Sequence, residues 1–173
     1  FYTTSKPIRS VEDLKGMKIR VQQTEVAISM VRALGAEATP MDYAEVFQGL
    51  QTGIVDGAEN DFVSYYTSGH YEVAKYYSLD QHMAPPAVLL MSKASWDKMT
   101  EAQQEAVRKA AYEAAVWQRQ AMQDYQLESR AACEAAGCEI IEVDVPSFQA
   151  AVASVYDEYP QYKTIVDMIN AVE

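Results

Sequence analysis

The longest uninterrupted helical pattern in this sequence begins at Thr100 and ends before Gly137. Residues 100–103, Thr-Glu-Ala-Gln, have the form of a capping box. No Gly or Pro follows until Gly137, and strong helix formers dominate the interval. A helix of about 36 residues would be about 54 Å long, whereas a compact domain of this chain length should be only about 40 Å across. We therefore expect either a break near residues 117–122 or a helix that spans two lobes, one of them partly outside this chain.

The first sixty residues alternate between strand patterns and helix patterns. Residues 17–21, Met-Lys-Ile-Arg-Val, alternate apolar and basic side chains, which indicates a strand with one buried face. A helical pattern over residues 25–34 ends at Gly35 and is followed by a short strand over 37–39. A capped helix over 42–53, with Asp42 as its cap, and a strand and turn over 54–60 complete the series. This order predicts an α/β sheet with right-handed crossovers.

The rest of the chain adds several local predictions. Six aromatic residues within 62–77 could line a cleft for a ring-shaped ligand, but we favour a core role for them. The apolar run 87–91 predicts a strand buried on both faces. A strand is expected over 139–143, a helix from Pro146, and an amphipathic segment over 162–172. Cys133 and Cys138 could form a local disulfide in an oxidising compartment or remain inert thiols.

Composition excludes several classes of partner. The chain has 173 residues, a formal charge of −11 and a pI near 4.6, which argues against nucleic acid and against an anionic membrane surface. No apolar run approaches the roughly 20 residues that cross a bilayer, so we expect no direct membrane insertion. The sequence has no zinc-protease motif, phosphate-binding loop or dinucleotide fingerprint, and we expect neither a metal nor a cofactor.

Polar residues at predicted strand ends form a candidate recognition site. Arg20 ends the first strand, where a guanidinium can bind a carboxylate through two parallel N–H bonds. Gln22 and Gln23 follow it, Tyr43 begins a helix, and Asn60 closes the third strand. In an open α/β sheet, ligands bind outside the carboxyl ends of the strands, so these side chains should converge there.

Three alternatives stay open from the residues alone. Lys18 and Arg20 could be only the solvent face of a half-buried strand. A small acid/base enzyme could use Glu59, Asp61 or His82, although no set of nucleophile, base and orienting group accompanies them. The long helix could also belong to a purely structural interaction protein.

A succession of motifs closely resembles one family, the solute-binding component of tripartite ATP-independent periplasmic (TRAP) transporters of the dicarboxylate-binding-protein type. The motifs are Asp-Leu-Lys-Gly-Met-Lys-Ile-Arg-Val at 13–21, Leu-Gly-Ala at 34–36, Tyr-Ala-Glu-Val at 43–46, Leu-Gln-Thr-Gly-Ile-Val-Asp-Gly-Ala-Glu-Asn at 50–60, and Trp96 before the long helix. The resemblance implies two α/β lobes of the type II periplasmic-binding-protein kind, with a cleft between them and a long helix that spans both.

The resemblance also implies a site. It assigns Arg20 to a salt bridge with the ligand carboxylate, Asn60 to a ligand contact, Tyr43 to packing on the ligand and Gln23 to the pocket. Residues 21–24, Val-Gln-Gln-Thr, which include Gln22, the segment 71–79 and His82 are most similar to members that bind sugar acids such as uronates. Simple C4-dicarboxylates, sialic acid and aromatic acids stay open as ligands. The expected function is capture of an organic acid in the periplasm and its delivery to the membrane subunits of a TRAP permease.

Family members are longer than this chain, so we expect it to be only part of one. The chain starts at Phe1 without a Met or a leader, which suggests processing or truncation of a precursor that carries a signal peptide. We assign residues 1–84 to the second, ligand-binding lobe and residues 85–120 to a crossover strand and the start of the long helix, in the first lobe. Residues 121–173 then form the return of the helix, a strand and the C-terminal helices.

Overall fold

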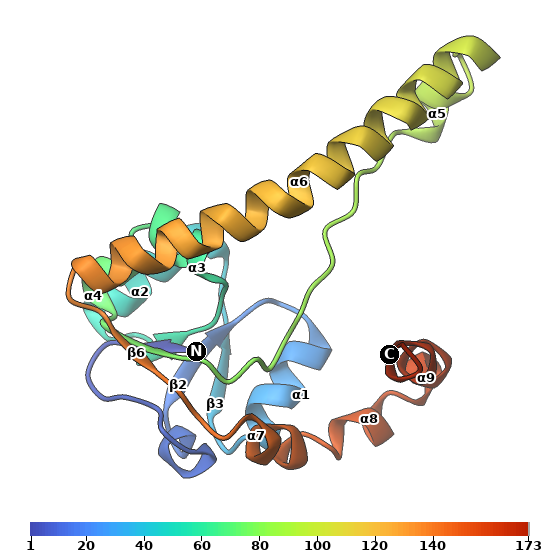
Figure 1. Ribbon diagram of the computed structural model, residues 1–173. Coiled ribbons are helices and arrows are strands. Elements are labelled where there is room, and N and C mark those ends of the chain that lie inside the picture. Colours follow the sequence, from blue (N-terminus) through green and yellow to red (C-terminus); the bar gives the residue numbers. More distant parts are fainter. Residues whose placement is uncertain (173) are drawn as a thin grey trace.

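A mixed β-sheet forms the centre of the protein (Figure 1) in a computed structural model that describes residues 1–172. The strands follow the order β3-β2-β4-β1-β5-β6 across the sheet. They are β1 (Tyr2–Thr3), β2 (Lys18–Val21), β3 (Glu37–Pro40), β4 (Gly57–Ala58), β5 (Tyr76–Ser78) and β6 (Glu139–Ile141). β1 is antiparallel to both of its neighbours, and the other pairs are parallel. The carboxyl ends of β2, β3 and β4 therefore lie at one edge, which confirms the predicted α/β sheet.

Helices cover both faces of this sheet. They are η1 (Val11–Leu14), α1 (Glu25–Ala33), η2 (Tyr43–Glu45), α2 (Val46–Thr52), α3 (Phe62–Thr67), α4 (His70–Val73), α5 (Lys93–Trp96), α6 (Glu101–Ala135), α7 (Val145–Ala151), α8 (Val155–Glu158), η3 (Pro160–Tyr162) and α9 (Lys163–Asn170). The side chains of Thr24 and Asp61 cap α1 and α3. Asp42 is the N-cap residue of η2, as predicted, but its side chain makes no capping hydrogen bond and accepts one from Gln23 instead.

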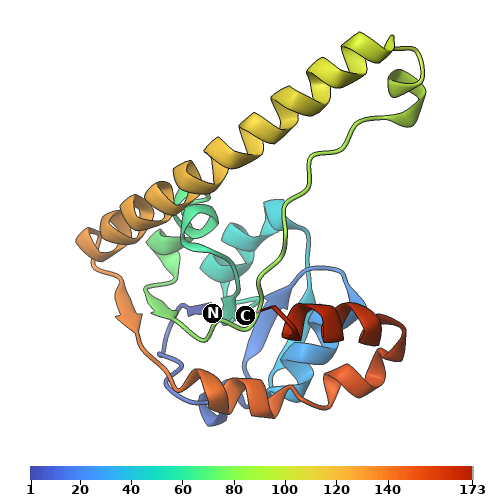
Figure 2. The same cartoon turned by 45° about the vertical axis from the view of Figure 1, so that its right-hand side comes forward.

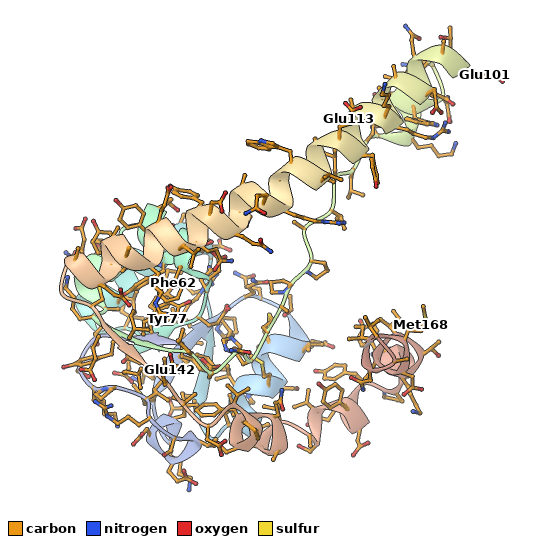
Figure 3. All side chains as sticks on the ribbon, viewed as in Figure 1. Phe62, Tyr77, Glu101, Glu113, Glu142 and Met168 are labelled. Carbon is orange, nitrogen blue, oxygen red and sulfur yellow. The ribbon has the colours of Figure 1, made fainter. Side chains whose placement is uncertain are left out.

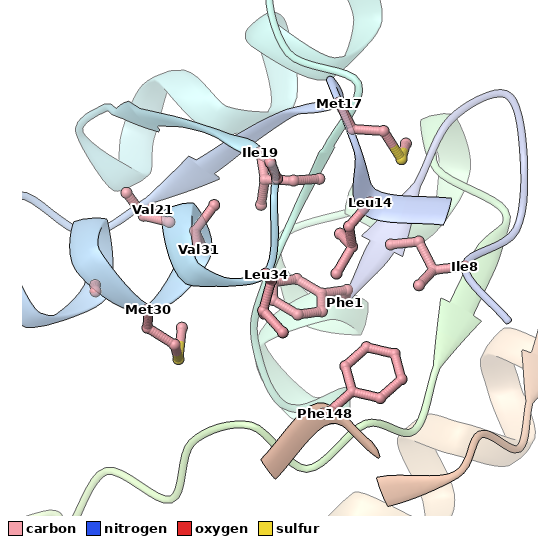
Figure 4. Close-up of a cluster of buried hydrophobic side chains, with 12 residues drawn as sticks. Phe1, Ile8, Leu14, Met17, Ile19, Val21, Met30, Val31, Leu34 and Phe148 are labelled. Carbon is pink, nitrogen blue, oxygen red and sulfur yellow. The ribbon is translucent and has the colours of Figure 1, made fainter. Parts of the chain in front are cut away.

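Two hydrophobic clusters lie on opposite sides of the sheet, as strand alternation requires. The first packs under η1, α1 and α7 (Figure 4) and comprises Phe1, Ile8, Leu14, Met17, Ile19, Val21, Ala27, Met30, Val31, Leu34, Ala36 and Phe148. The second contains Tyr2, Val46, Leu50, Val55, Ala58, Phe62, Tyr65, Ala74, Tyr77, Cys133 and Cys138. The core role predicted for the aromatic segment is confirmed for Phe62, Tyr65 and Tyr77, which are at most 8% exposed.

Helix α6 is continuous over 35 residues, about 52 Å, without the break considered near residues 117–122. Its C-terminal half packs on α3, where the Arg130 guanidinium lies over the Phe62 ring at 5.9 Å. Its N-terminal half projects away from the sheet together with α5 (Figures 1 and 3). Tyr112 and Trp117, on that half, are each 73% exposed. The helix therefore overhangs the body of the chain, as its length predicts.

The strand predicted over residues 87–91 is not formed. The segment runs as extended chain from the sheet toward α5 (Figure 2), and Val88, Leu89 and Leu90 are 72–83% exposed. A strand buried on both faces requires neighbours, and none among the described residues pairs with it. Residues 142 and 143 likewise lie beyond the end of β6, and Pro146 is the second rather than the first residue of α7.

The division at residues 84 and 120 stays a prediction. β6 returns from the end of α6 to pair with β5, so residues after 120 complete the same sheet as residues 2–78. None of the helices within residues 1–172 is long and apolar enough to cross a membrane.

Candidate functional site

Arg20 is buried at the edge where β2, β3 and β4 end. Its guanidinium donates from Nε and Nη2 to the carbonyl oxygen of Met41, at 3.0 and 2.9 Å, just after β3. Only 3% of the residue is exposed, although Lys18 on the same strand is exposed. The idea that both residues are a solvent face is therefore wrong for Arg20, which points toward the second cluster. The hydrogen bonds to the main-chain carbonyl hold one side of the guanidinium, and because the group is planar they also fix the direction of its other side.

Glu59 and His82 continue this buried polar group. Glu59 follows β4, and its Oε1 lies 3.9 Å from Nη1 of Arg20. Its Oε2 lies 3.8 Å from Nε2 of His82, whose Nδ1 is hydrogen-bonded to Asp80. Burial disfavours protonation of His82, but the Asp80 and Glu59 carboxylates outweigh it and raise its pKa. Oε1 of Glu59 and Nε2 of His82 have no hydrogen-bond partner among residues 1–172.

Tyr43 lies close to Arg20, whereas Gln23 is bound to Asp42. The Tyr43 ring centre is 5.7 Å from the Arg20 guanidinium carbon, a cation–π distance, and its hydroxyl is hydrogen-bonded to Ser68. Gln23 is exposed and donates to Asp42 at 2.9 Å. The structure thus brings Tyr43 next to Arg20, while Gln23 is joined to the start of η2.

A cavity of about 810 Å³ opens between this edge of the sheet, the chain 78–87 and helix α6. Of the predicted residues, Gln22, Asn60 and His82 line it, whereas Arg20, Tyr43 and Gln23 do not. Arg20 lies directly behind Glu59, which is part of the wall. The predicted residues are therefore split between the cavity wall and the layer around Arg20.

Sequence reasoning missed several parts of this site. The Met41 carbonyl carries no side-chain signal, and Asp80 is far from Arg20 in the sequence. Helix α6 contributes Gln118, Arg119, Met122, Gln123 and Gln126 to the cavity. Their spacing of three and four residues places them on one helix face, a signal that was present in the sequence.

The acidic residues on either side of β4 have separate structural roles. Asp56 accepts from the Lys18 backbone N–H at 2.8 Å, and Asp61 caps α3. Within residues 1–172, no group of three or more His, Cys, Asp and Glu side chains could hold a metal ion. Glu59 and His82 remain adjacent in the cavity wall.

Comparisons with known proteins identify the family. Residues 1–162 match the model of the bacterial extracellular solute-binding protein family 7, DctP. A solute-binding protein of Chromohalobacter salexigens is 43% identical over 98% of this chain and 52% of its own length.

Two crystal structures of TRAP periplasmic solute-binding proteins are also similar. The protein from Xanthobacter autotrophicus Py2, with bound β-D-galacturonate, has a TM-score of 0.94 and 47% identity over 99% of this chain and 58% of its own. The protein from Roseobacter denitrificans, with bound β-D-glucuronate, has a TM-score of 0.94 and 40% identity over 99% of this chain and 59% of its own.

This chain spans about half the length of the curated relatives that it matches. Because the family and these structures are solute-binding proteins and not enzymes, the acid/base enzyme considered from Glu59, Asp61 and His82 is wrong. The purely structural alternative is wrong for the same reason. With the buried arginine at the strand ends and the periplasmic-binding-protein fold, the matches show that the chain belongs to the DctP family of TRAP-type solute-binding proteins.

Proposed function

We propose that the protein containing this chain binds a uronate in the periplasm and delivers it to the membrane subunits of a TRAP permease. The similar structures with bound galacturonate and glucuronate support this class of ligand. The family description, extracellular solute-binding protein, supports the location. Membership of the TRAP-type family supports transfer to a permease.

The buried Arg20 is the observation that carries the proposal. Of its five N–H groups, two donate to the Met41 carbonyl, which leaves three for a ligand. Glu59, at 3.9 Å, is beyond hydrogen-bond distance. Because Glu59 lies between Arg20 and the cavity, a carboxylate that displaces the Glu59 side chain would gain charge-assisted bonds to Arg20 in a site shielded from water.

Polar groups around the cavity suit the hydroxyl groups of a sugar acid. Gln22 and Asn60 each offer donors and acceptors, while Glu59 offers an acceptor and His82 a ring nitrogen. The stacked rings of Phe62 and Tyr77, 4.1 Å apart, form an apolar part of the same wall. A cavity of about 810 Å³ is within the usual range for small-molecule sites.

Calorimetric titration of the full-length protein tests the proposal. We expect D-glucuronate or D-galacturonate to bind and D-glucose, which lacks the carboxylate, to bind far more weakly. Arg20→Ala should weaken uronate binding about 100-fold, which corresponds to about 2.7 kcal/mol for a lost charge-assisted interaction. Asn60→Ala should weaken binding without changing the circular dichroism spectrum.

Arg9→Ala is the matched control, because Arg9 is an exposed arginine paired with Glu139 at the far end of the sheet. It should leave uronate affinity unchanged. Wild-type affinity in folded Arg20→Ala, or equal affinity for glucose, would refute the carboxylate role of Arg20. Delivery is tested separately, by uptake of radiolabelled uronate into proteoliposomes that contain the TRAP membrane subunits.

A further inference from the structure

The C-terminal end of α6 has a backbone geometry that brings two cysteines together. Gly137 adopts a left-handed conformation with φ +84°, which a Gly accommodates without strain. The N–H of Cys138 donates to the carbonyl of Cys133, and the N–H of Gly137 donates to the carbonyl of Glu134, both at 3.0 Å. These two bonds define a Schellman motif. In this motif the residues at the Cys133 and Cys138 positions commonly contact each other.

Both cysteines are free and buried, at 0% and 8% exposure. A disulfide requires the two residues to lie close together, and the direct backbone hydrogen bond of the Schellman motif brings Cys133 and Cys138 near each other. The Tyr65 hydroxyl lies 3.3 Å from Sγ of Cys138, and the Tyr71 carbonyl lies 3.6 Å from it. These contacts place the pair beneath the α3–α4 connection, in the second hydrophobic cluster.

We propose that Cys133 and Cys138 form a disulfide when the protein matures in an oxidising compartment. The family is extracellular, and disulfides persist in such compartments. The bond would join the last turn of α6 to the residue before β6. The proposal does not depend on which ligand the protein binds.

The oxidation requires a disulfide as the electron acceptor, such as a thiol–disulfide oxidoreductase or oxidised glutathione. The Cys138 thiolate attacks one acceptor sulfur and displaces the other as a thiolate, giving a mixed disulfide. The Cys133 thiolate then attacks Sγ of Cys138 and displaces the acceptor sulfur bonded to it as a thiolate. The two cysteines lose two protons and two electrons in total, and the acceptor disulfide gains them to become two thiol groups.

Burial limits when this exchange can take place. Burial, and then the adjacent Cys138, raises the pKa of Cys133 to about 11, so the packed thiol is a weak nucleophile at neutral pH. We therefore expect the bond to form during folding, before Tyr65 packs over the pair. Protein that folds with both thiols reduced should resist later oxidation by glutathione disulfide.

The test uses full-length protein exported to the periplasm of a bacterial host. The protein is unfolded in guanidinium with excess iodoacetamide, once without and once with prior reduction, and peptides are analysed by mass spectrometry. We expect neither cysteine to be alkylated without reduction and both after reduction. A peptide spanning residues 133–138 should lack two hydrogen atoms relative to its reduced form.

Cys133→Ala supplies the matched control, because Cys138 then has no local partner and should be alkylated without reduction. A second measurement compares melting with and without reductant, which should lower the melting temperature of the wild type but not of the variant. Full alkylation of both cysteines in unreduced wild-type protein would overturn the proposal. A mixed disulfide with glutathione or a link between two chains would overturn it equally.

Discussion

The buried pair of Arg20 and Glu59 allows a quantitative test of how strongly these two side chains stabilise each other in the ligand-free protein. The two groups are 3% and 6% exposed, and Nη1 and Oε1 are 3.9 Å apart. At an effective dielectric constant of 20, two opposite charges at this distance attract by about 4 kcal/mol. Removing one partner of such a pair typically costs about 3–5 kcal/mol, because the other charge stays buried and unpaired.

We predict that a double-mutant cycle with Arg20→Met and Glu59→Gln gives a coupling energy of about 4 kcal/mol. Each single variant should have a much lower free energy of unfolding than the wild type. The double variant should be only slightly less stable than the less stable of the two single variants. Urea unfolding of the ligand-free protein at pH 7 measures the free energy of unfolding for all four proteins. The two hydrogen bonds to Met41, which only Arg20→Met removes, cancel in the cycle.

The exposed pair of Arg9 and Glu139 is the matched control. Its atoms are closer, at 2.6 Å, but its side chains are 60% and 48% exposed. Solvent screening should hold the coupling energy of that pair below about 1 kcal/mol. If the buried pair couples no more strongly than the exposed one, burial does not strengthen the Arg20–Glu59 interaction and our account of the site is refuted.

The two histidines should give opposite pH dependences. His82 has a raised pKa, so its contribution to stability is complete below pH 6.5 and is lost as pH rises through the folded-state pKa. The melting-temperature difference between wild type and His82→Gln should therefore shrink as pH rises through that value. Burial, and then Arg20, lowers the pKa of His70 to about 4, so its contribution of about 3 kcal/mol to stability is lost as pH falls from 6.5 to 4. The melting-temperature difference between wild type and His70→Gln should therefore shrink as pH falls. Parallel pH profiles for the two variants would contradict this assignment. Gly57→Ala should cost about 3 kcal/mol in urea unfolding, because its Cβ would lie 2.6 Å from a backbone oxygen of β1. Gly53→Ala, with nothing within 4 Å, should cost only about 1 kcal/mol from its positive φ; equal losses would show that space around Gly57 is not limiting.

Local periodicity was sufficient to locate much of the fold and part of the site. The alternation over residues 17–21 placed Arg20 near a strand end, and the strand and turn predicted over 54–60 placed Asn60 just after the next strand. Both positions follow from strand ends, which a single sequence reveals through changes of period. The continuous α6 followed from its capping box and from the lack of Gly and Pro.

The errors and omissions concern long-range contacts. Residues 87–91 have the composition of a buried strand, but burial depends on neighbours that the described chain does not supply. Glu59 and His82 are 23 positions apart, and no local pattern indicates that their side chains meet. Asp42 occupies the predicted cap position, yet its side chain accepts a hydrogen bond from Gln23 of another loop instead of capping η2. Which of several polar partners a side chain selects is decided by tertiary packing.

Helix α6, of which only the C-terminal half packs on the body of the chain, connects the cavity mechanically to any domain that surrounds its N-terminal end. Its inner half rests on α3, which begins immediately after Asn60 and Asp61. A helix resists bending, so a force on the outer turns near Glu101 (Figure 3) would act through a lever of about 44 Å on Arg130, whose guanidinium lies over the Phe62 ring. If a neighbouring domain tilted α6, Phe62 and the cavity wall would shift together. Domain motion would then change the affinity of the cavity for its ligand.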